Sequence, residues 1–355
     1  MENLKRTSLY DKHVKLGARN VGFCGWDMPV QYEGVIKEHH ACRNDVALFD
    51  ISHMGEFYFK GDIANSGVNL ATTTDFVKLP IGKCKYGFML NKDGGTIDDL
   101  IVYKLSEDEL MFVVNAARID VDFAQIKSHI KSGTFENRSD ITSKIDLQGP
   151  NSKKMLQPLV SFDLDELSFF GFKQTTLLGK PAIVSRTGYT GELGYELYID
   201  NETAPLLWDK LIDDGATPAG LGARDVLRLE KGYSLYGHEL SEEISPLEAS
   251  IGFFIQYSSD FTGREAIEKQ KEQGIKRAVI PFVTKSKRSP RNGFEVFQNG
   301  QKIGYVTSGT YSPCLDEGIG LALVDTTLYD DSKEIEIKLQ RGSMPGYKAT
   351  LPFYK

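Results

Sequence analysis

The chain has 355 residues, of which 41% are hydrophobic and 26% are charged, and this length predicts two or three domains with buried cores. Its 42 basic and 49 acidic residues give a net charge of −7, which argues against a general nucleic-acid binder. The ordinary hydrophobic content excludes a mainly disordered chain.

Neither the cysteines nor the termini indicate a metal protein or a membrane protein. The four cysteines contain no Cys-x-x-Cys pair, and the histidines have no acid or cysteine at metal-ligand spacing, so we expect no metal. The first residues lack the apolar core of a signal peptide, and no segment approaches the roughly 18 apolar residues of a spanning helix. The sequence therefore predicts a cytoplasmic protein without a membrane partner.

The first half of the chain alternates strand-like and helix-like segments. Apolar alternation and turn residues predict strands at 55–60, 86–90, 96–103, 109–115 and 143–147, and helices at 62–71, with Asp62 as N-cap, and at 117–130. The polar run 91–95 predicts a hairpin turn. This order resembles an α+β module of ferredoxin-like type with an extra strand.

A similar order follows, and then the character of the chain changes. Helices are expected from 150 onward, at 202–212 and at 222–230, with strands at 181–185 and 195–199. The two modules suggest an architectural duplication. From about Arg277 short β-rich segments at 278–283, 302–307, 318–324 and 334–339 predict a separate all-β domain, with a helical connector at 263–273.

Three segments carry residues suited to chemistry. Asp98 and Asp99 stand together at the start of a predicted strand, where successive side chains face opposite sides, so that only one carboxylate can enter a given cavity. The segment 186–196 combines glycines, tyrosines and acids, and Arg224 and Arg228 share one face of the predicted helix at 222–230. Turn acids, an ordinary glycine-rich hairpin and surface ion pairs remain the structural alternatives for these three segments.

The ordered set of motifs resembles the aminomethyltransferase, or T protein, of the glycine cleavage system over nearly the whole chain. These motifs are 25–32, 49–56, 94–103, 147–150, 185–192, 220–230 and 307–309. The resemblance implies an α+β, three-domain cloverleaf, with two ferredoxin-like α+β modules and a C-terminal β-barrel or jelly-roll-like domain around a central folate funnel. The expected domains are 1–51 plus 140–262 for folate binding, 52–139 as the ferredoxin-like domain and 275–355 as the C-terminal β domain.

The resemblance also implies an activity and its partners. It implies transfer of the methylene carbon of the aminomethyl group, carried on the lipoyl arm of the H protein, to tetrahydrofolate as co-substrate. The products would be 5,10-methylenetetrahydrofolate, ammonia and the dihydrolipoyl carrier, in glycine catabolism. A folate-dependent demethylase of another donor and a non-catalytic folate-binding protein of the same fold are the alternatives.

Carried over by position, the family pattern implies roles for nine residues. Asp99 would be the catalytic carboxylate, and Glu196 would hold the pterin edge. The remaining implied folate-site residues are Met54, Tyr86, Asn115, Tyr189, Arg224, Tyr233 and Tyr236. Where the family often has an acid, this chain has Leu193.

The chemistry of transfer agrees with this pattern. Carbon–sulfur cleavage builds positive charge on the methylene carbon, and a fixed carboxylate such as Asp99 stabilises that charge and aligns the attacking nitrogen. A basic run, Lys285, Lys287, Arg288 and Arg291, could meet an acidic carrier protein or the glutamate tail of folate, and a solvated loop is its alternative reading.

Overall fold

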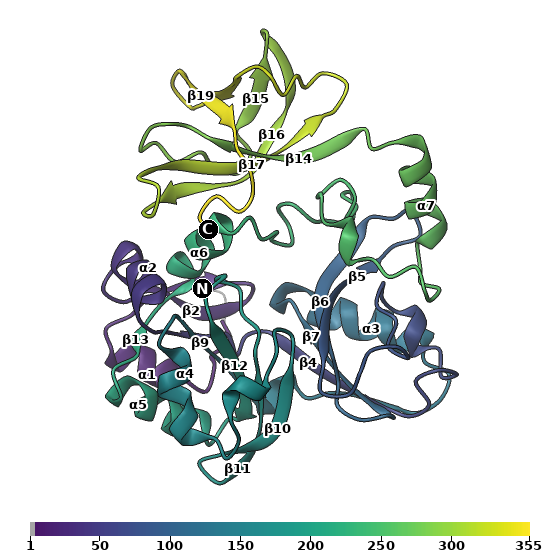
Figure 1. Cartoon of the computed structure of the whole chain (residues 1–355), viewed down its shortest axis with the longest axis vertical. Coiled ribbons are helices and arrows are strands. Elements are labelled where there is room, and N and C mark those ends of the chain that lie inside the picture. Colours follow the sequence, from purple (N-terminus) through teal and green to yellow (C-terminus); the bar gives the residue numbers. More distant parts are fainter. Residues whose placement is uncertain (1–3) are drawn as a thin grey trace. The chain divides into compact units, whose positions relative to one another are not determined.

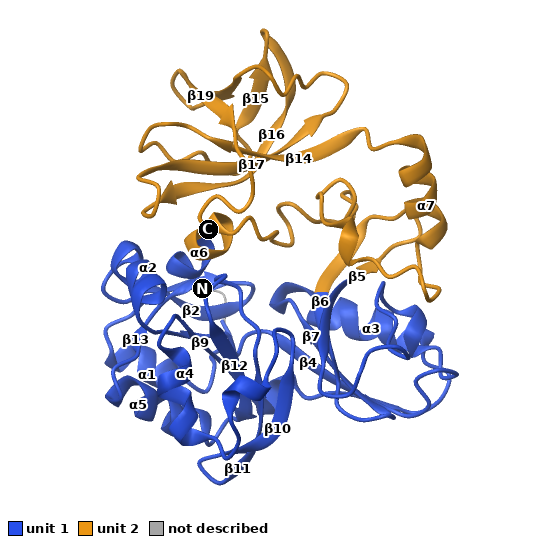
Figure 2. Cartoon of the chain, viewed as in Figure 1, with its two compact units in different colours: residues 1–87, 100–225 blue, residues 88–99, 226–355 orange. Residues whose placement is uncertain are grey.

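The computed structural model describes residues 4–355 and divides into two compact units (Figures 1 and 2). The first unit contains the described residues up to 87 together with 100–225, and the second contains 88–99 and 226–355. The chain therefore passes between the units within two strands and one helix, which are β5 (Cys84–Leu90), β6 (Thr96–Lys104) and α6 (Leu221–Glu230).

The first unit holds most of the helices and two larger sheets. Its other helices are α1 (Tyr10–Lys15), α2 (Val35–Asn44), α3 (Ile119–His129), α4 (Ser152–Leu156) and α5 (Ala204–Asp213). Its other strands are β1 (Arg19–Phe23), β2 (Trp26–Gln31), β3 (Ala47–Asp50), β4 (Gly55–Lys60), β7 (Glu109–Val114), β8 (Thr134–Asn137), β9 (Thr142–Gln148), β10 (Phe172–Leu177), β11 (Lys180–Ser185), β12 (Gly194–Asp200) and β13 (Thr217–Pro218).

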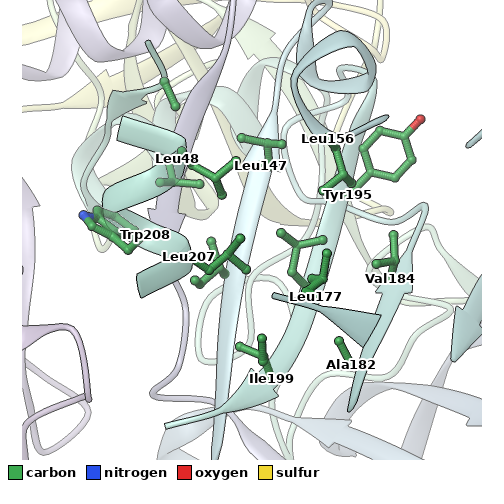
Figure 3. Close-up of a cluster of buried hydrophobic side chains, with 14 of the residues drawn as sticks. Leu48, Leu147, Leu156, Leu177, Ala182, Val184, Tyr195, Ile199, Leu207 and Trp208 are labelled. Atoms are coloured by element: carbon green, nitrogen blue, oxygen red, sulfur yellow. The ribbon is translucent and has the colours of Figure 1, made fainter. Parts of the chain in front are cut away.

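A six-stranded sheet in the order β10-β11-β12-β9-β3-β13 organises the first unit. Its pairs are antiparallel except for the short parallel contact of β13 with β3. Ile145 and Leu147 of β9 and Leu197 and Ile199 of β12 alternate with polar residues, so that one face of the sheet is apolar. Figure 3 shows this face with its cluster of leucines and aromatic rings.

Helix α5 closes that apolar face because its sequence has one apolar stripe. Leu207, Trp208 and Leu211 recur at helical spacing and are fully buried in the same cluster. Pro205 lies in the first turn, where its missing N–H leaves no hydrogen bond unmade. Burying each large side chain of this kind stabilises the fold by about 2 kcal/mol.

A second sheet has five strands in the order β5-β6-β7-β4-β8. Its fifth strand is β8, whereas the strand predicted at 143–147 is β9 and belongs to the six-stranded sheet. The assignment of 143–147 to the first module is therefore wrong. Local alternation predicts a strand but contains no information on its distant partner, which here is β12.

The helix expected at 62–71 is also wrong. The segment forms turns and a single 3-10 turn at Val68–Leu70, and the carboxylate of Asp62 accepts the backbone N–H groups of Ala64 and Asn65. Gly67 has a φ of 90°, and a Cβ there would lie 2.1 Å from the carbonyl oxygen of His129. Asn, Ser and Gly are weak helix formers, so the close approach to α3 determines the local conformation.

The second unit contains a closed barrel in the order β14-β17-β16-β15-β18-β19. The barrel strands are β14 (Arg277–Val283), β15 (Glu295–Gln298), β16 (Gln301–Ser312), β17 (Glu317–Asp325), β18 (Ile335–Lys338) and β19 (Ser343–Lys348). Helix α7 (Arg264–Gln273) precedes the barrel in the chain. Its interior is apolar, with Phe282, Val306 and Ile337 fully buried. The prediction of a C-terminal all-β domain and of a helix before it is confirmed. None of the described helices is long and apolar enough to cross a bilayer.

Candidate folate site and catalytic carboxylate

The second face of the six-stranded sheet carries buried polar side chains on its two central strands, β9 and β12. Lys144, Asp146 and Gln148 alternate along β9, and Glu196 and Tyr198 alternate along the neighbouring β12. The strand register places Glu196 opposite Asp146 and Tyr198 opposite Lys144. Two carboxylates in directly opposed positions repel each other, so this face requires buried cations.

Lys144 supplies the first cation. Its Nζ lies 3.0 Å from Oε1 of Glu196, and the Thr187 hydroxyl donates a 2.6 Å hydrogen bond to Oε2. Burial disfavours the charged form of Glu196, but the charge of Lys144 and the Thr187 hydrogen bond outweigh it and hold the pKa below its usual range. Glu196 is therefore a buried, ionised acceptor.

Arg224 of α6 supplies the second cation. Its Nη1 donates to Oδ2 of Asp146 at 2.7 Å, and Nε2 of Gln148 donates to Oδ1 at 2.6 Å. Burial raises the pKa of Asp146 to about 7, against the opposing effect of Arg224. The alternative of a surface ion pair is therefore wrong for Arg224, which forms a buried pair with Asp146.

The glycine-rich loop wraps around the side chain of Gln148. Nε2 of Gln148 donates to the carbonyl of Thr187 at 3.0 Å, and the Thr190 hydroxyl donates to Oε1 at 2.7 Å. A Cβ at Gly188 or Gly194 would lie 2.3 Å or 2.2 Å from the Gln148 amide. Glycine is needed at both positions because no larger residue leaves room for this amide.

Four of the predicted folate-site residues meet in this network. Glu196 and Arg224 are members of it, the Arg224 guanidinium carbon lies 4.9 Å from the ring centroid of Tyr189, and Nζ of Lys144 lies 3.6 Å from Sδ of Met54. The structure thus brings Met54, Tyr189, Glu196 and Arg224 together from three segments of the chain.

Tyr86 lies on β5 of the five-stranded sheet, and Asn115 directly follows β7 of the same sheet. Met54 and Asn115 each stand one residue beyond the Gly55–Val114 pair, at the same end of the β4–β7 ladder. Both side chains are half-buried. Tyr86 is half-buried on β5, and the contacts described above do not extend to it.

Asp99, Tyr233 and Tyr236 belong to the second unit. Asp98 is fully buried and Asp99 is partly exposed, as successive residues of β6 facing opposite sides. Tyr233 and Tyr236 are half-buried in the segment after α6.

The hairpin tip before Asp99 is fastened to the segment 241–244. The backbone N–H of Thr96 donates to the carbonyl of Ser241 at 2.8 Å, and the Asn91 amide donates to the carbonyl of Glu242 at 2.9 Å. A Cβ at Gly95 would lie 1.8 Å from that Glu242 oxygen. These contacts fix the start of the strand that carries Asp99.

Arg228 is buried and fixes the segment that carries Tyr233. Its Nη1 donates to the carbonyl of Tyr233 at 3.0 Å and to Glu239 at 3.3 Å, and its Nη2 donates to the Ser308 hydroxyl at 2.8 Å. Because Ser308 lies on β16, this guanidinium joins the segment to the barrel.

Sequence reasoning missed Lys144, Asp146 and Glu56. The signal was present as a period of two, because charged residues alternate with Ile145 and Leu147 in a segment predicted as a strand. Polar residues that alternate in this way normally indicate a strand face exposed to solvent, and the sequence did not show that this face is buried. Glu56 of β4 is fully buried, and neither of its carboxylate oxygens has a hydrogen-bond partner among residues 4–355.

Comparison with known proteins places the chain in a family. Residues 9–259 match the family described as the GCVT N-terminal domain, and residues 277–355 match the glycine cleavage T-protein C-terminal barrel domain. The chain therefore belongs to the glycine cleavage T-protein family.

Individual relatives agree along the full length. The chain is 44% identical to an aminomethyltransferase of Caldanaerobacter subterraneus, over 100% of this chain and 97% of the relative. It is 45% identical to an aminomethyltransferase of Thermotoga sp. strain RQ2, over 99% and 98%. The crystal structure of glycine cleavage system aminomethyltransferase T from Bartonella henselae is similar with a TM-score of 0.93 at 30% identity, covering 99% of this chain and 98% of that one. The demethylase and the non-catalytic binder are not favoured by these relatives.

Proposed function

We propose that the chain performs the aminomethyl transfer of its family with tetrahydrofolate as acceptor and the lipoylated H protein as donor, with Asp99 as the catalytic carboxylate. Aminomethyltransferase activity in the glycine cleavage system is the activity that family membership and the full-length relatives show. The identity of the acceptor and carrier, the arrangement of the domains around a funnel, and the residue roles are the proposed part.

The buried, ionised carboxylate of Glu196 is the observation that supports the folate assignment. The 2-amino-4-oxopyrimidine edge of a reduced pterin presents two parallel N–H donors, and a carboxylate is their matching acceptor. A carboxylate offers about four acceptor positions. Lys144 and Thr187 occupy two of them at short distance, and the Tyr198 hydroxyl lies at 3.4 Å. Acceptor capacity therefore remains for a ligand.

Asp99 suits the reacting end of the substrate by its chemistry. Transfer breaks two bonds of the methylene carbon: the bond to sulfur, whose electron pair goes to sulfur, and the bond to the amino nitrogen. Two carbon–nitrogen bonds to tetrahydrofolate form in their place, and the two N–H protons that the folate loses go to the sulfur and to the amino group, which leaves as ammonia. Positive charge builds on the methylene carbon as sulfur leaves, and a fixed carboxylate stabilises it. The fastened hairpin tip limits the motion of this carboxylate.

A steady-state assay with aminomethylated H protein tests the proposal. Ammonia release should depend on tetrahydrofolate, and Glu196→Gln should raise the KM for tetrahydrofolate about tenfold or more, since a neutral amide pairs poorly with two donors. Glu192→Gln is the matched control, because Glu192 lies in the same loop and pairs with Arg43. Ammonia release that ignores tetrahydrofolate, or an unchanged KM in Glu196→Gln, would contradict the proposal.

The basic run of 285–291 is a candidate contact for the carrier or for the folate tail. Lys287 is exposed and pairs with Asp316 at 2.8 Å, and the ammonium of Lys285 lies 4.0 Å from the ring centroid of Tyr347. Charge reversal at Arg288 and Arg291 should raise the KM of the partner that they contact, in a salt-dependent way. Varying the H protein and polyglutamylated folate separately identifies that partner, and no change in either KM would dismiss the role.

A further inference from the structure

We propose that Lys144 is a positioning residue for folate recognition, which keeps the carboxylate of Glu196 ionised and fixed in place, while Glu56, a second carboxyl group near the same lysine, stays protonated. The inference rests on the proposed role of Glu196. It concerns how this chain keeps the carboxylate of Glu196 ionised although the side chain is buried.

The first argument is the geometry of Lys144. Its ammonium is buried, lies 3.0 Å from Glu196 and 3.6 Å from the sulfur of Met54, and stands 5.2 Å from the ring centroid of Tyr198. Two of these neighbours are candidate folate-site residues, so the lysine lies directly behind them. A strand position and a short ion pair leave its side chain little freedom.

The second argument is a charge balance. Three carboxyl groups, Glu56, Asp146 and Glu196, belong to this buried region, which holds two cations, Lys144 and Arg224. Arg224 is hydrogen-bonded to Asp146, which is partly protonated near neutral pH. Lys144 is paired with Glu196, so neither cation forms an ion pair with Glu56. Ionisation of Glu56 would leave one buried negative charge without a cation, which is strongly unfavourable.

The third argument is the hydrogen bonding of Glu56. Both of its oxygens are without a hydrogen-bond partner among residues 4–355, whereas each oxygen of Glu196 has at least one polar partner. A buried ionised carboxylate requires donors and a neutral carboxyl group needs fewer. Burial raises the pKa of Glu56 well above its usual range, with the negative charge of Glu196 adding to the effect and that of Lys144 opposing it.

Other titratable groups surround Lys144, Glu196 and Glu56, and they must be considered in any pH profile of the KM. Tyr58 lies on the strand of Glu56, and the remaining groups come from the elements packed nearby, namely His53, Cys84, Tyr103, Asp146, Tyr198 and Arg224. Burial raises the pKa of the Cys84 thiol to about 12. Burial raises the pKa of each of the three tyrosines. In the neutral range the groups left to titrate are thus Asp146 and any carboxylate that loses its cation.

Kinetics of three variants test the assignment. Lys144→Met should raise the KM for tetrahydrofolate about tenfold at neutral pH, and the KM should rise further as pH falls, because Glu196 without its lysine takes up a proton. Glu56→Gln should match the wild type from about pH 6 to about pH 8, since it replaces one neutral group by another of the same shape. Glu109→Gln, on the neighbouring strand β7, is the matched control and should also match the wild type.

The melting temperature of double variants gives a second measurement, which remains informative even if Lys144→Met folds poorly. Adding Glu196→Gln should restore most of the melting temperature lost in Lys144→Met, because it removes the stranded charge, and adding Glu56→Gln should not. Rescue by Glu56→Gln, or a Glu56→Gln enzyme whose KM rises like that of Lys144→Met, would overturn the inference. An unchanged KM in Glu196→Gln would instead reject the proposed function.

Discussion

The polar face of the six-stranded sheet and the interior of the C-terminal barrel are both buried, yet they are filled in opposite ways. The barrel is filled by Phe282, Val306 and Ile337 and other apolar groups, whose contribution is the removal of surface from water. The centre of the sheet face, on β9 and β12, is instead occupied by Lys144, Asp146 and their ion-pair partners.

This difference separates stability from function. Apolar filling gains free energy without choosing a ligand, whereas buried ion pairs contribute little net stability and are costly to break. In the proposed function, the buried pairs on the sheet face hold Glu196 ready to bind folate. The predictions below test this separation, beginning with the largest expected effect.

Phe282→Ala should give the largest loss of stability. Phe282 is fully buried in the barrel, and removal of such a ring costs about 3–5 kcal/mol of unfolding free energy. Chemical denaturation measures the loss, and the KM for tetrahydrofolate of the folded fraction should stay unchanged. Phe297→Ala, at a half-buried barrel position, is the control and should cost less. An equal loss in the two variants would break the comparison.

Asp99→Asn should give the opposite pattern. Removing one fixed charge at a reacting centre costs on the order of 3 kcal/mol in the transition state, about a hundredfold in kcat. Folate affinity and the unfolding free energy should stay within a few fold and about 1 kcal/mol of the wild type.

Single-turnover transfer from aminomethylated H protein measures the effect of Asp99→Asn. Asp93→Asn is the control, since Asp93 is exposed in the same hairpin. A kcat of Asp99→Asn near that of the control would reject the catalytic assignment.

His53 should make stability depend on acid pH. Burial lowers its pKa to about 4, against the pull of Asp50 and with help from Arg224 and Lys144. Between about pH 6.5 and pH 4, His53 is protonated in the unfolded chain but neutral in the folded chain. Its contribution to the unfolding free energy is therefore complete above about pH 6.5 and is lost as the pH falls toward 4.

The expected loss from His53 is about 3 kcal/mol over this range, at about 1.4 kcal/mol per unit. His53→Phe should remove this part of the pH dependence of unfolding, measured by urea titration at several pH values. Parallel curves for the variant and the wild type would show that His53 does not titrate in this way.

Glu295→Gln should give the smallest effect. Glu295 and Lys302 form an exposed 2.7 Å ion pair on the barrel, and such pairs contribute at most about 0.5–1 kcal/mol. Unfolding free energy and KM should both be near those of the wild type. A loss comparable to that of Phe282→Ala would show that surface charge, and not the apolar interior, stabilises the barrel.

The sequence predicted those elements whose signal is local. Alternation located β4, β12 and β17, and the turn at 91–95 was evident from its Asn and Gly residues. The resemblance to a known family led to Met54, Tyr189, Glu196 and Arg224, which the structure brings into one network.

The rest depended on contacts between distant segments. Asp146 and Glu196 are fifty positions apart in numbering, and only the β9–β12 register makes them neighbours. The local sequence of 62–71 predicted a helix, but the close approach of Gly67 to the backbone of His129, which the sequence does not reveal, imposes another conformation. Glu56 gave no signal, because an acid in an alternating strand normally faces water.

The alternation along β9 has one more consequence. If β9 paired with β12 one residue out of register, its charged side chains would face the apolar core, and Ile145 and Leu147 would face the opposite side of the sheet. A one-residue slip is therefore strongly disfavoured, because it would place an ammonium group and carboxylates in the apolar core. The charged residues of β9 thus also help to specify the pairing register of the sheet.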